Sequence, residues 1–168
     1  MIKLCGIILV MLCCVGVSIK RMNTYKCRSK ELTQVKKLLD LFESQIRYCA
    51  EPTSEIILDF VRINREDDCP VISCCADMVS NGHPFPAAMR ECCDHCESSL
   101  TGEEINALAE FSGTIGRSDA ESDIKCCKSY GELFLNQLNE AREQESSKGR
   151  MAIRLGLLAA AAAFILFI

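Results

Sequence analysis

The residues best suited to chemistry in this sequence are its cysteines, 13 in a chain of 168 residues. The densest group is Cys92-Cys93-Asp94-His95-Cys96, in which Cys92 and Cys96 lie four residues apart and would share one face of a helix. Thiolates and imidazoles are ligands of zinc, but a structural zinc site has four of them. The remaining ligands could come from Cys74, Cys75 or His83.

Core packing accounts for the cysteines better than metal binding does. No second Cys-x-x-Cys pair stands at zinc-knuckle spacing, and Met89, Cys93, Cys96 and Leu100 recur at the three- and four-residue steps of a buried helix face. Ten cysteines lie outside the first hydrophobic segment, an even number that would also suit five disulfides in a secreted chain. We expect free thiols that pack as small apolar side chains, with no metal and no cofactor. Disulfides or a redox role are the alternatives.

Little in the sequence favours catalysis. There are two histidines, and no Gly-rich phosphate loop, nucleophile elbow or His-Glu-x-x-His motif occurs. Glu103-Glu104 and Asp67-Asp68 are paired carboxylates, but the first pair opens a helix, where acids favour the helix dipole. We therefore expect a protein that is not an enzyme and has no small-molecule substrate.

Both ends of the chain are hydrophobic. Residues 4–19 and 155–168 carry no charge. Sixteen helical residues cover about 24 Å, somewhat less than a hydrocarbon core of about 30 Å, and flanking lysines can extend the span by snorkelling. The sequence predicts transmembrane anchors at 1–20 and 151–168, with a helical domain at 21–150 between them.

The charges are segregated along the chain. Between Glu51 and Glu145 there are 20 acidic and 7 basic residues, whereas the stretches beside the two anchors are basic. So acidic a middle argues against nucleic acid as a partner. The basic flanks favour anionic lipid head groups and, by the positive-inside rule, place the helical domain in the cytoplasm and both termini outside.

Helical periodicity dominates the middle of the chain, and no alternating strand pattern is convincing. A helix is predicted over 29–49, a second after Pro52, a third over 71–79 ending at Asn81-Gly82, and a fourth from Pro84. Thr101–Glu104 and Ser118–Glu121 are capping boxes that open the last two helices, and Gly116 stops the first of them. The second continues without a strong break into the C-terminal anchor. The apolar patterns place Ile63 on the buried side of the helix after Pro52 and Ala120 on the buried side of the last helix. The fold class is all-α, an antiparallel bundle of about six helices flanked by an N-terminal and a C-terminal transmembrane helix.

Several motifs match one known family. They are Phe111, Gly116-Arg-Ser-Asp119, the helix through Leu138 and Ala141, Leu155-Gly156 and, more loosely, Lys3-Leu4-x-Gly6, Glu43-x-x-Ile46-x-Tyr48 and Pro52. On these the chain resembles the stage III sporulation protein AB family of endospore-forming bacteria, over nearly its whole length. It departs from the family pattern in lacking a tryptophan near Ala88-Met89, in having Asp123 where glutamine is usual, and in its many cysteines.

The resemblance implies a scaffold subunit of the channel complex between mother cell and forespore. Members of this family are similar to the inner-membrane platform of type II secretion systems. By that likeness the domain would contact a secretion-type ATPase and other membrane subunits, at the mother-cell membrane. The candidate contact residues are Gly116, Ser118, Asp119, Glu132 and Glu140. For the two glutamates, an ordinary solvated helix face is the simpler interpretation.

A different class of protein is the alternative. The hydrophobic tail after Ser146-Ser147 also permits a GPI-anchored, disulfide-rich surface protein, with a signal peptide cleaved near Gly16–Ser18. Against it, Arg154 interrupts the tail, no Asn-x-Ser/Thr sequon occurs, and the basic run after the first segment favours an uncleaved anchor.

Overall fold

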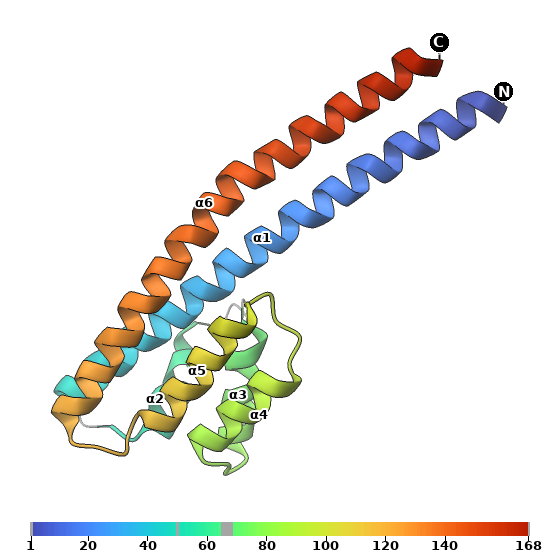
Figure 1. Ribbon diagram of the computed structural model, residues 1–168. Helices are drawn as coiled ribbons and strands as arrows, with labels where there is room; N and C mark the ends of the chain where they lie inside the picture. Colours follow the sequence, from blue (N-terminus) through green and yellow to red (C-terminus); the bar gives the residue numbers. More distant parts are fainter. Residues whose placement is uncertain (1, 50, 65–68, 168) are drawn as a thin grey trace. The chain divides into compact units, whose positions relative to one another are not determined.

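The computed structural model describes the backbone of residues 2–49, 51–64 and 69–167, and the side chains of residues 23–49, 51–64 and 69–147. Its described residues form six helices and no strand, which confirms the all-helical class. The helices are α1 (Ile2–Tyr48), α2 (Thr53–Ile63), α3 (Pro70–Ser80), α4 (Phe85–His95), α5 (Gly102–Thr114) and α6 (Ala120–Phe167) (Figure 1).

The first and last helices are continuous. The sequence predicted a separate N-terminal anchor followed by a helix from Ser29, but α1 runs unbroken from Ile2 to Tyr48. The predicted long final helix is confirmed, because α6 extends from Ala120 to Phe167. Among the residues whose side chains are described, no helix combines the length and apolarity needed to cross a membrane. The two predicted anchors, 1–20 and 151–168, lie outside those residues.

The chain divides into two compact units. The terminal unit comprises Met1–Ser29 and Asn139–Ile168, and in it the Arg28 guanidinium donates a hydrogen bond to the side-chain oxygen of Gln144 (3.4 Å). The core unit comprises Lys30–Leu138. Within the core unit α3 packs against α2 and α4, and α4 packs against α5 (Figure 1).

Aromatic rings join four helices at the centre of the core unit. Phe42 of α1 lies with its ring centroid 5.3 Å from that of Phe85 on α4 and 5.5 Å from that of Phe111 on α5. The ring centroid of Tyr130 on α6 lies 5.6 Å from that of Phe111, in edge-to-face geometry. Edge-to-face packing of this kind stabilises a core beyond simple burial. A sequence without tryptophan therefore builds its core from phenylalanines, aliphatic residues and cysteines.

Most helix ends follow the signals in the sequence. Gly82, at φ +91°, ends α3: its N–H donates to the carbonyl of Val79, and the N–H of His83 donates to that of Met78, which is a Schellman motif. Thr101 opens α5 with both bonds of the predicted capping box, to and from Glu104. Prolines precede or occupy the first turns of α2, α3 and α4, where a missing N–H costs nothing.

A buried carboxylate ties α1 to the linker between α4 and α5. Glu31 is 5% exposed, and its two oxygens accept the backbone N–H of Ser99 at 3.0 and 3.1 Å. The hydroxyl of Ser98 donates to the same carboxylate. Burial of the Glu31 carboxylate is unfavourable in free energy, and these hydrogen bonds compensate for the contacts with water that it loses. The tie fixes the direction in which the chain leaves α4 and enters α5.

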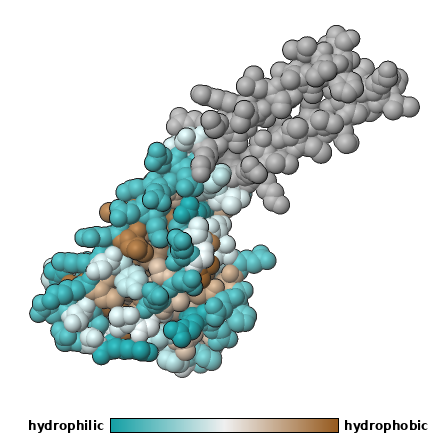
Figure 2. All heavy atoms as spheres, viewed as in Figure 1, coloured by the Kyte–Doolittle hydropathy of each residue, from teal (hydrophilic) through white to brown (hydrophobic). Residues whose placement is uncertain are grey.

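Two buried positions were predicted wrongly. Ile63 was placed on the buried side of α2 but is 69% exposed, because it is the last residue of that helix. Ala120 was placed on the buried face of α6 but is exposed at its first residue. Helix ends leave their last side chains beyond the packed middle. Figure 2 shows one face of the molecule, and the residues coloured there are mostly hydrophilic, with small apolar patches.

Candidate functional site

Three of the cysteines named as candidate ligands come together in the core unit. Cys74 lies in the middle of α3, Cys92 in the last turn of α4, and Cys96 is the residue that caps α4. Their sulfur atoms all lie within 4.8 Å of one another. Cys92 is buried, whereas Cys74 and Cys96 are half-buried. We refer to these three residues as the thiol cluster.

The neighbouring cysteines belong to the core instead. Cys75 and Cys93, each next to a member of the thiol cluster, are 0% and 7% exposed. Burial raises the pKa of Cys75 to about 12 and that of Cys93 to about 11, and nearby thiols or carboxylates add to the effect. Burial likewise raises the pKa of Cys69 and of Cys127 to about 12. These four thiols stay protonated at neutral pH and act as apolar packing, as predicted.

Within the thiol cluster the sulfurs influence each other directly. Burial raises the pKa of Cys92, and a hydrogen bond with the Cys74 side chain raises it further. Burial followed by the hydrogen bond to Cys74 also raises the pKa of Cys96. All ten cysteines with described side chains are free thiols. The predicted ligand candidates His83 and His95 are both exposed and do not join the thiol cluster.

The predicted contact residues Gly116, Ser118 and Asp119 share the turn between α5 and α6, and all three are exposed. Gly116 has φ +76°, and its N–H donates to the carboxylate of Asp123 at 3.1 Å. A Cβ at this position would lie 3.1 Å from the methyl carbon of Thr53, at the start of α2. The turn is therefore held from two sides, by α6 and by α2.

The start of α6 differs by one residue from the prediction. The sequence placed the cap at Ser118, with Glu121 reaching back to it. In the structure the backbone carbonyl of Asp119 accepts the N–H of Asp123, and the Asp119 carboxylate accepts the N–H of Ser122 (3.3 Å). The second capping box is thus wrong, and Asp119 is the N-cap. The hydrogen bonds to Ser122 lower the pKa of Asp119, which keeps the cap ionised.

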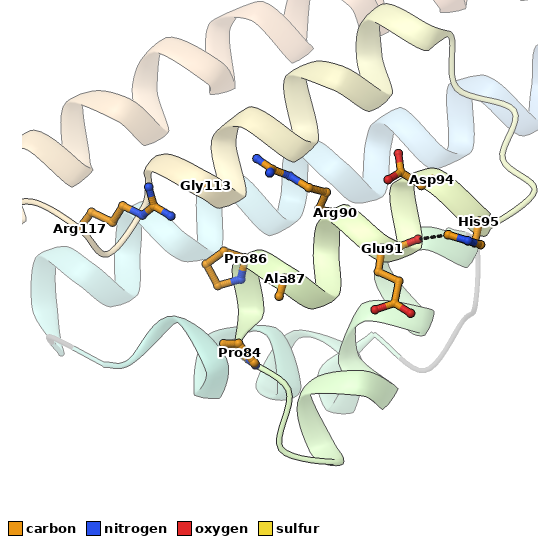
Figure 3. A pocket seen from close by; sticks show the side chains of 9 residues that line it. All are labelled: Pro84, Pro86, Ala87, Arg90, Glu91, Asp94, His95, Gly113 and Arg117. Atoms are coloured by element: carbon orange, nitrogen blue, oxygen red, sulfur yellow. Dashed lines mark hydrogen bonds between the residues drawn. The ribbon is translucent and has the colours of Figure 1, made fainter.

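A groove of about 610 Å³ runs along α4 and α5 and reaches this turn. Figure 3 shows Arg90 of α4 and Arg117 of the turn pointing toward one another beside Gly113. Glu91, Asp94 and His95 line the other part of the groove. The groove thus has a cationic part and a mainly acidic part on an otherwise acidic domain. Its remaining lining residues are Pro84, Pro86 and Ala87.

The two predicted contact residues on α6 fall in different units. Glu132 belongs to the core unit, where it lines a second groove of about 330 Å³ with charged residues of α1 and α6: Lys36, Asp40, Glu43 and Lys128. Glu140 belongs to the terminal unit. Both are exposed. Leu133 and Leu135 beside Glu132 are each 42% exposed, so this stretch of α6 displays apolar as well as acidic side chains.

The family of the chain follows from a sequence match that covers nearly its whole length. The pattern that defines the family described as stage III sporulation protein AB (spore_III_AB) matches residues 3–168. The chain belongs to the stage III sporulation protein AB family. No curated protein matches the sequence significantly.

A solved structure agrees with the family at the level of the fold. It is described as stage III sporulation protein AB (SpoIIIAB), and it matches with a TM-score of 0.61 at 18% sequence identity, over 72% of this chain and 98% of that one. The predicted resemblance to the stage III sporulation protein AB family is therefore confirmed, and a role connected with sporulation follows from it. Membership of this family does not favour a GPI-anchored surface protein.

Sequence reasoning missed two features of this member of the stage III sporulation protein AB family. The groove between α4 and α5 was not foreseen, although Arg117 stands inside the Gly116–Asp119 motif that carried the resemblance. The role of Asp123 was also missed. Its carboxylate is 6% exposed and accepts the Gly116 N–H. In the sequence, Asp123 stands out only as an expected departure from the family pattern.

Proposed function

We propose that this protein is a scaffold subunit of the sporulation channel complex between mother cell and forespore, which couples a secretion-type ATPase to membrane subunits and catalyses no reaction itself. The observation that carries the proposal is the family match over residues 3–168. The family supplies the connection with sporulation, and the scaffold role rests on the likeness to the type II secretion platform.

The contact surface in this proposal is the α5–α6 turn together with the groove beside it. Gly116, Ser118 and Asp119 are exposed on a turn that α2 and α6 hold in place. A rigid turn supports the idea, because a partner that transmits force gains little from a contact that yields. Arg90 and Arg117 offer guanidinium groups that can each bind a carboxylate in two-pronged fashion. An acidic segment of the ATPase is the partner chemistry that fits them.

The proposal places 1–20 and 151–168 in the bilayer as anchors, with the domain 21–150 on the cytoplasmic side of the mother-cell membrane. The uncharged stretches 4–19 and 155–168 and the basic residues beside them support it. Alkaline carbonate extraction of membranes should leave the full chain in the pellet. Protease added outside intact cells should not digest residues 30–145, and digestion there would invert the topology.

The ATPase contact is tested by reversing one charge in the groove. In a pull-down of the secretion-type ATPase with the full chain, Arg117→Glu should weaken binding at least about tenfold, because it replaces attraction by repulsion. Arg62→Glu is the control, since Arg62 is also an exposed arginine but lies on α2 outside the groove, in an ion pair with Asp59 (2.7 Å). Equal binding by both variants would remove the groove from the proposal.

The acidic stretch of α6 is tested separately. Glu132→Lys and Glu140→Lys reverse the two candidate charges, one in each unit. Weaker binding of the ATPase by either variant would extend the contact surface to α6. Binding unchanged in both would confine it to the turn and the groove.

A further inference from the structure

The thiol cluster differs from the other cysteines because its three sulfur atoms lie close to one another. In the pair Cys74-Cys75 one cysteine packs into the core and the other joins the thiol cluster, whereas both Cys92 (1% exposed) and Cys93 (7%) are buried and only Cys92 joins it. Packing accounts for Cys75 and Cys93. It does not account for the convergence of three sulfurs, those of Cys74 on α3, Cys92 on α4 and Cys96 at the end of α4, on one point.

A fourth sulfur lies against the thiol cluster. The Sδ atom of Met78 is 3.5 Å from the Sγ atom of Cys92, and Met78 stands one helical turn after Cys74 on α3. Among the described residues no histidine or carboxylate joins the three cysteines as a further ligand. His95, although adjacent to Cys96, has its Nδ1 3.0 Å from the Glu91 carbonyl oxygen and lines the groove that contains Arg90 and Arg117 (Figure 3).

The sulfur separations suit a single ion. A metal–sulfur bond of about 2.3 Å in tetrahedral geometry places its sulfurs about 3.8 Å apart. The sulfurs of the thiol cluster are within 4.8 Å of one another, so side-chain rotations that close each gap by at most about 1 Å would complete the site. Cys74 and Cys96 are half-buried, which leaves an ion a path from solvent.

We propose that Cys74, Cys92 and Cys96 bind one thiophilic d¹⁰ metal ion, Cu⁺ or Zn²⁺, with the Met78 thioether beside it. Each thiol that becomes a ligand releases its proton to solvent as the metal–sulfur bond forms, and no oxidant or reductant is needed. Cu⁺ suits the site better, because thiolate and thioether ligands select it, whereas a structural Zn²⁺ needs a fourth strong ligand. The bound ion would join the middle of α3 to the end of α4.

The binding test uses the full chain, reduced and purified in detergent without oxygen. Cu⁺ is supplied from its coloured complex with bicinchoninate, and Zn²⁺ from a chromophoric zinc indicator in a parallel titration. The unmodified chain should withdraw one equivalent of metal more from the indicator than the Cys96→Ser variant does. Cys74→Ser, which changes a thiol on the other helix, should bind one equivalent less in the same way. Whichever indicator shows the difference identifies the ion.

The control is Cys126→Ser, which changes another half-buried helical cysteine outside the thiol cluster. It should withdraw as much metal as the unmodified chain, and a thiolate-to-metal absorption band should persist in it but weaken in Cys96→Ser. Circular dichroism of each variant separates loss of the site from loss of the fold, and Cys74→Ser answers the question should Cys96→Ser unfold. The proposal is overturned if the chain withdraws no metal from either indicator. It is also overturned if Cys96→Ser and Cys126→Ser withdraw equal amounts of metal.

Discussion

The turns that end α3 and α5 each contain a glycine at positive φ, but they differ in what surrounds it. Gly82 is at φ +91° with nothing within 4 Å of the position a Cβ would take. Gly116 is at φ +76°, with the Thr53 methyl 3.1 Å from that position and the Asp123 carboxylate on its N–H. The first turn is completed by bonds to α3 itself, whereas the second is bonded to Asp123 at the start of the next helix and lies close to Thr53 of α2.

The difference separates a local signal from a tertiary constraint. The α3 turn is a Schellman motif that the residues of one helix end can build alone. The α5–α6 turn takes its shape from α2 and α6, so its conformation reports on the packing of the core unit. It is also the turn that carries Arg117 and the candidate contact residues, which makes its rigidity relevant to partner binding.

The sharpest test of this comparison is Gly116→Ala. The substitution forces an alanine into the left-handed region and places its Cβ against the Thr53 methyl, so the free energy of unfolding should fall by about 2–3 kcal/mol. Thermal unfolding followed by circular dichroism measures it. Adding Thr53→Ser removes the methyl and should recover part of the loss. No recovery in the double variant would show that the backbone conformation alone, and not the contact, is responsible.

Removal of the Asp123 carboxylate, the second support of the α5–α6 turn, should lower the free energy of unfolding somewhat less than Gly116→Ala does. Asp123→Ala leaves the Gly116 N–H without its carboxylate acceptor, and we expect a loss of about 2 kcal/mol in the free energy of unfolding. Asp123→Asn keeps an acceptor oxygen and should lose less than half as much. Urea unfolding of the three proteins checks the order. Equal losses in the two variants would mean that the negative charge, not the hydrogen bond, supports the turn.

The α3 turn should be the more tolerant of the two. Gly82→Ala meets no neighbour, so only the backbone preference opposes it, and we expect a loss of about 1 kcal/mol. Gly82→Asn should lose still less, because asparagine enters the left-handed region more readily. If Gly82→Ala destabilised the chain as much as Gly116→Ala in the same melting experiment, the two turns would not differ in the way described.

The smallest effect is expected at the start of α6. Asp119 is fully exposed and caps the helix through the N–H of Ser122, so Asp119→Ala should lower the melting temperature less than Gly82→Ala does. Ser118→Ala should have no effect, because Ser118 is not the cap. A larger effect at Ser118 than at Asp119 would restore the capping box that the sequence had predicted.

Local signals made the helices of this chain predictable. Three helix ends depend only on residues within one turn, and each is where the sequence placed it. They are the capping box at Thr101, the Asn81-Gly82 end of α3, and the prolines before α2 and α4. The core residues Leu32, Val35, Leu39 and Phe42 follow from the periodicity of one helix. The resemblance then fixed the family, which no periodicity could have done.

Features that depend on packing between helices were harder to foresee. Asp123 looks like an ordinary first-turn acid until the α5–α6 turn brings Gly116 to it. The thiol cluster shows the same limit: the pairing of Cys92 with Cys96 follows from helical spacing, but the choice of Cys74 rather than Cys75 depends on the rotation of α3 against α4. One residue of rotation decides which thiol enters the core.

The ring of Tyr130 against Phe111 gives the chain an optical reporter of its own folding. With no tryptophan and three tyrosines in the sequence, the near-ultraviolet signal comes from tyrosine and phenylalanine. Tyr48 is 79% exposed, so its surroundings change little on unfolding, whereas Tyr130 is half-buried in edge-to-face contact with a buried ring. Tyr25 of the terminal unit is half-buried as well. In a Tyr25→Phe chain, near-ultraviolet dichroism can thus follow the loss of packing at the meeting point of α5 and α6, without a label.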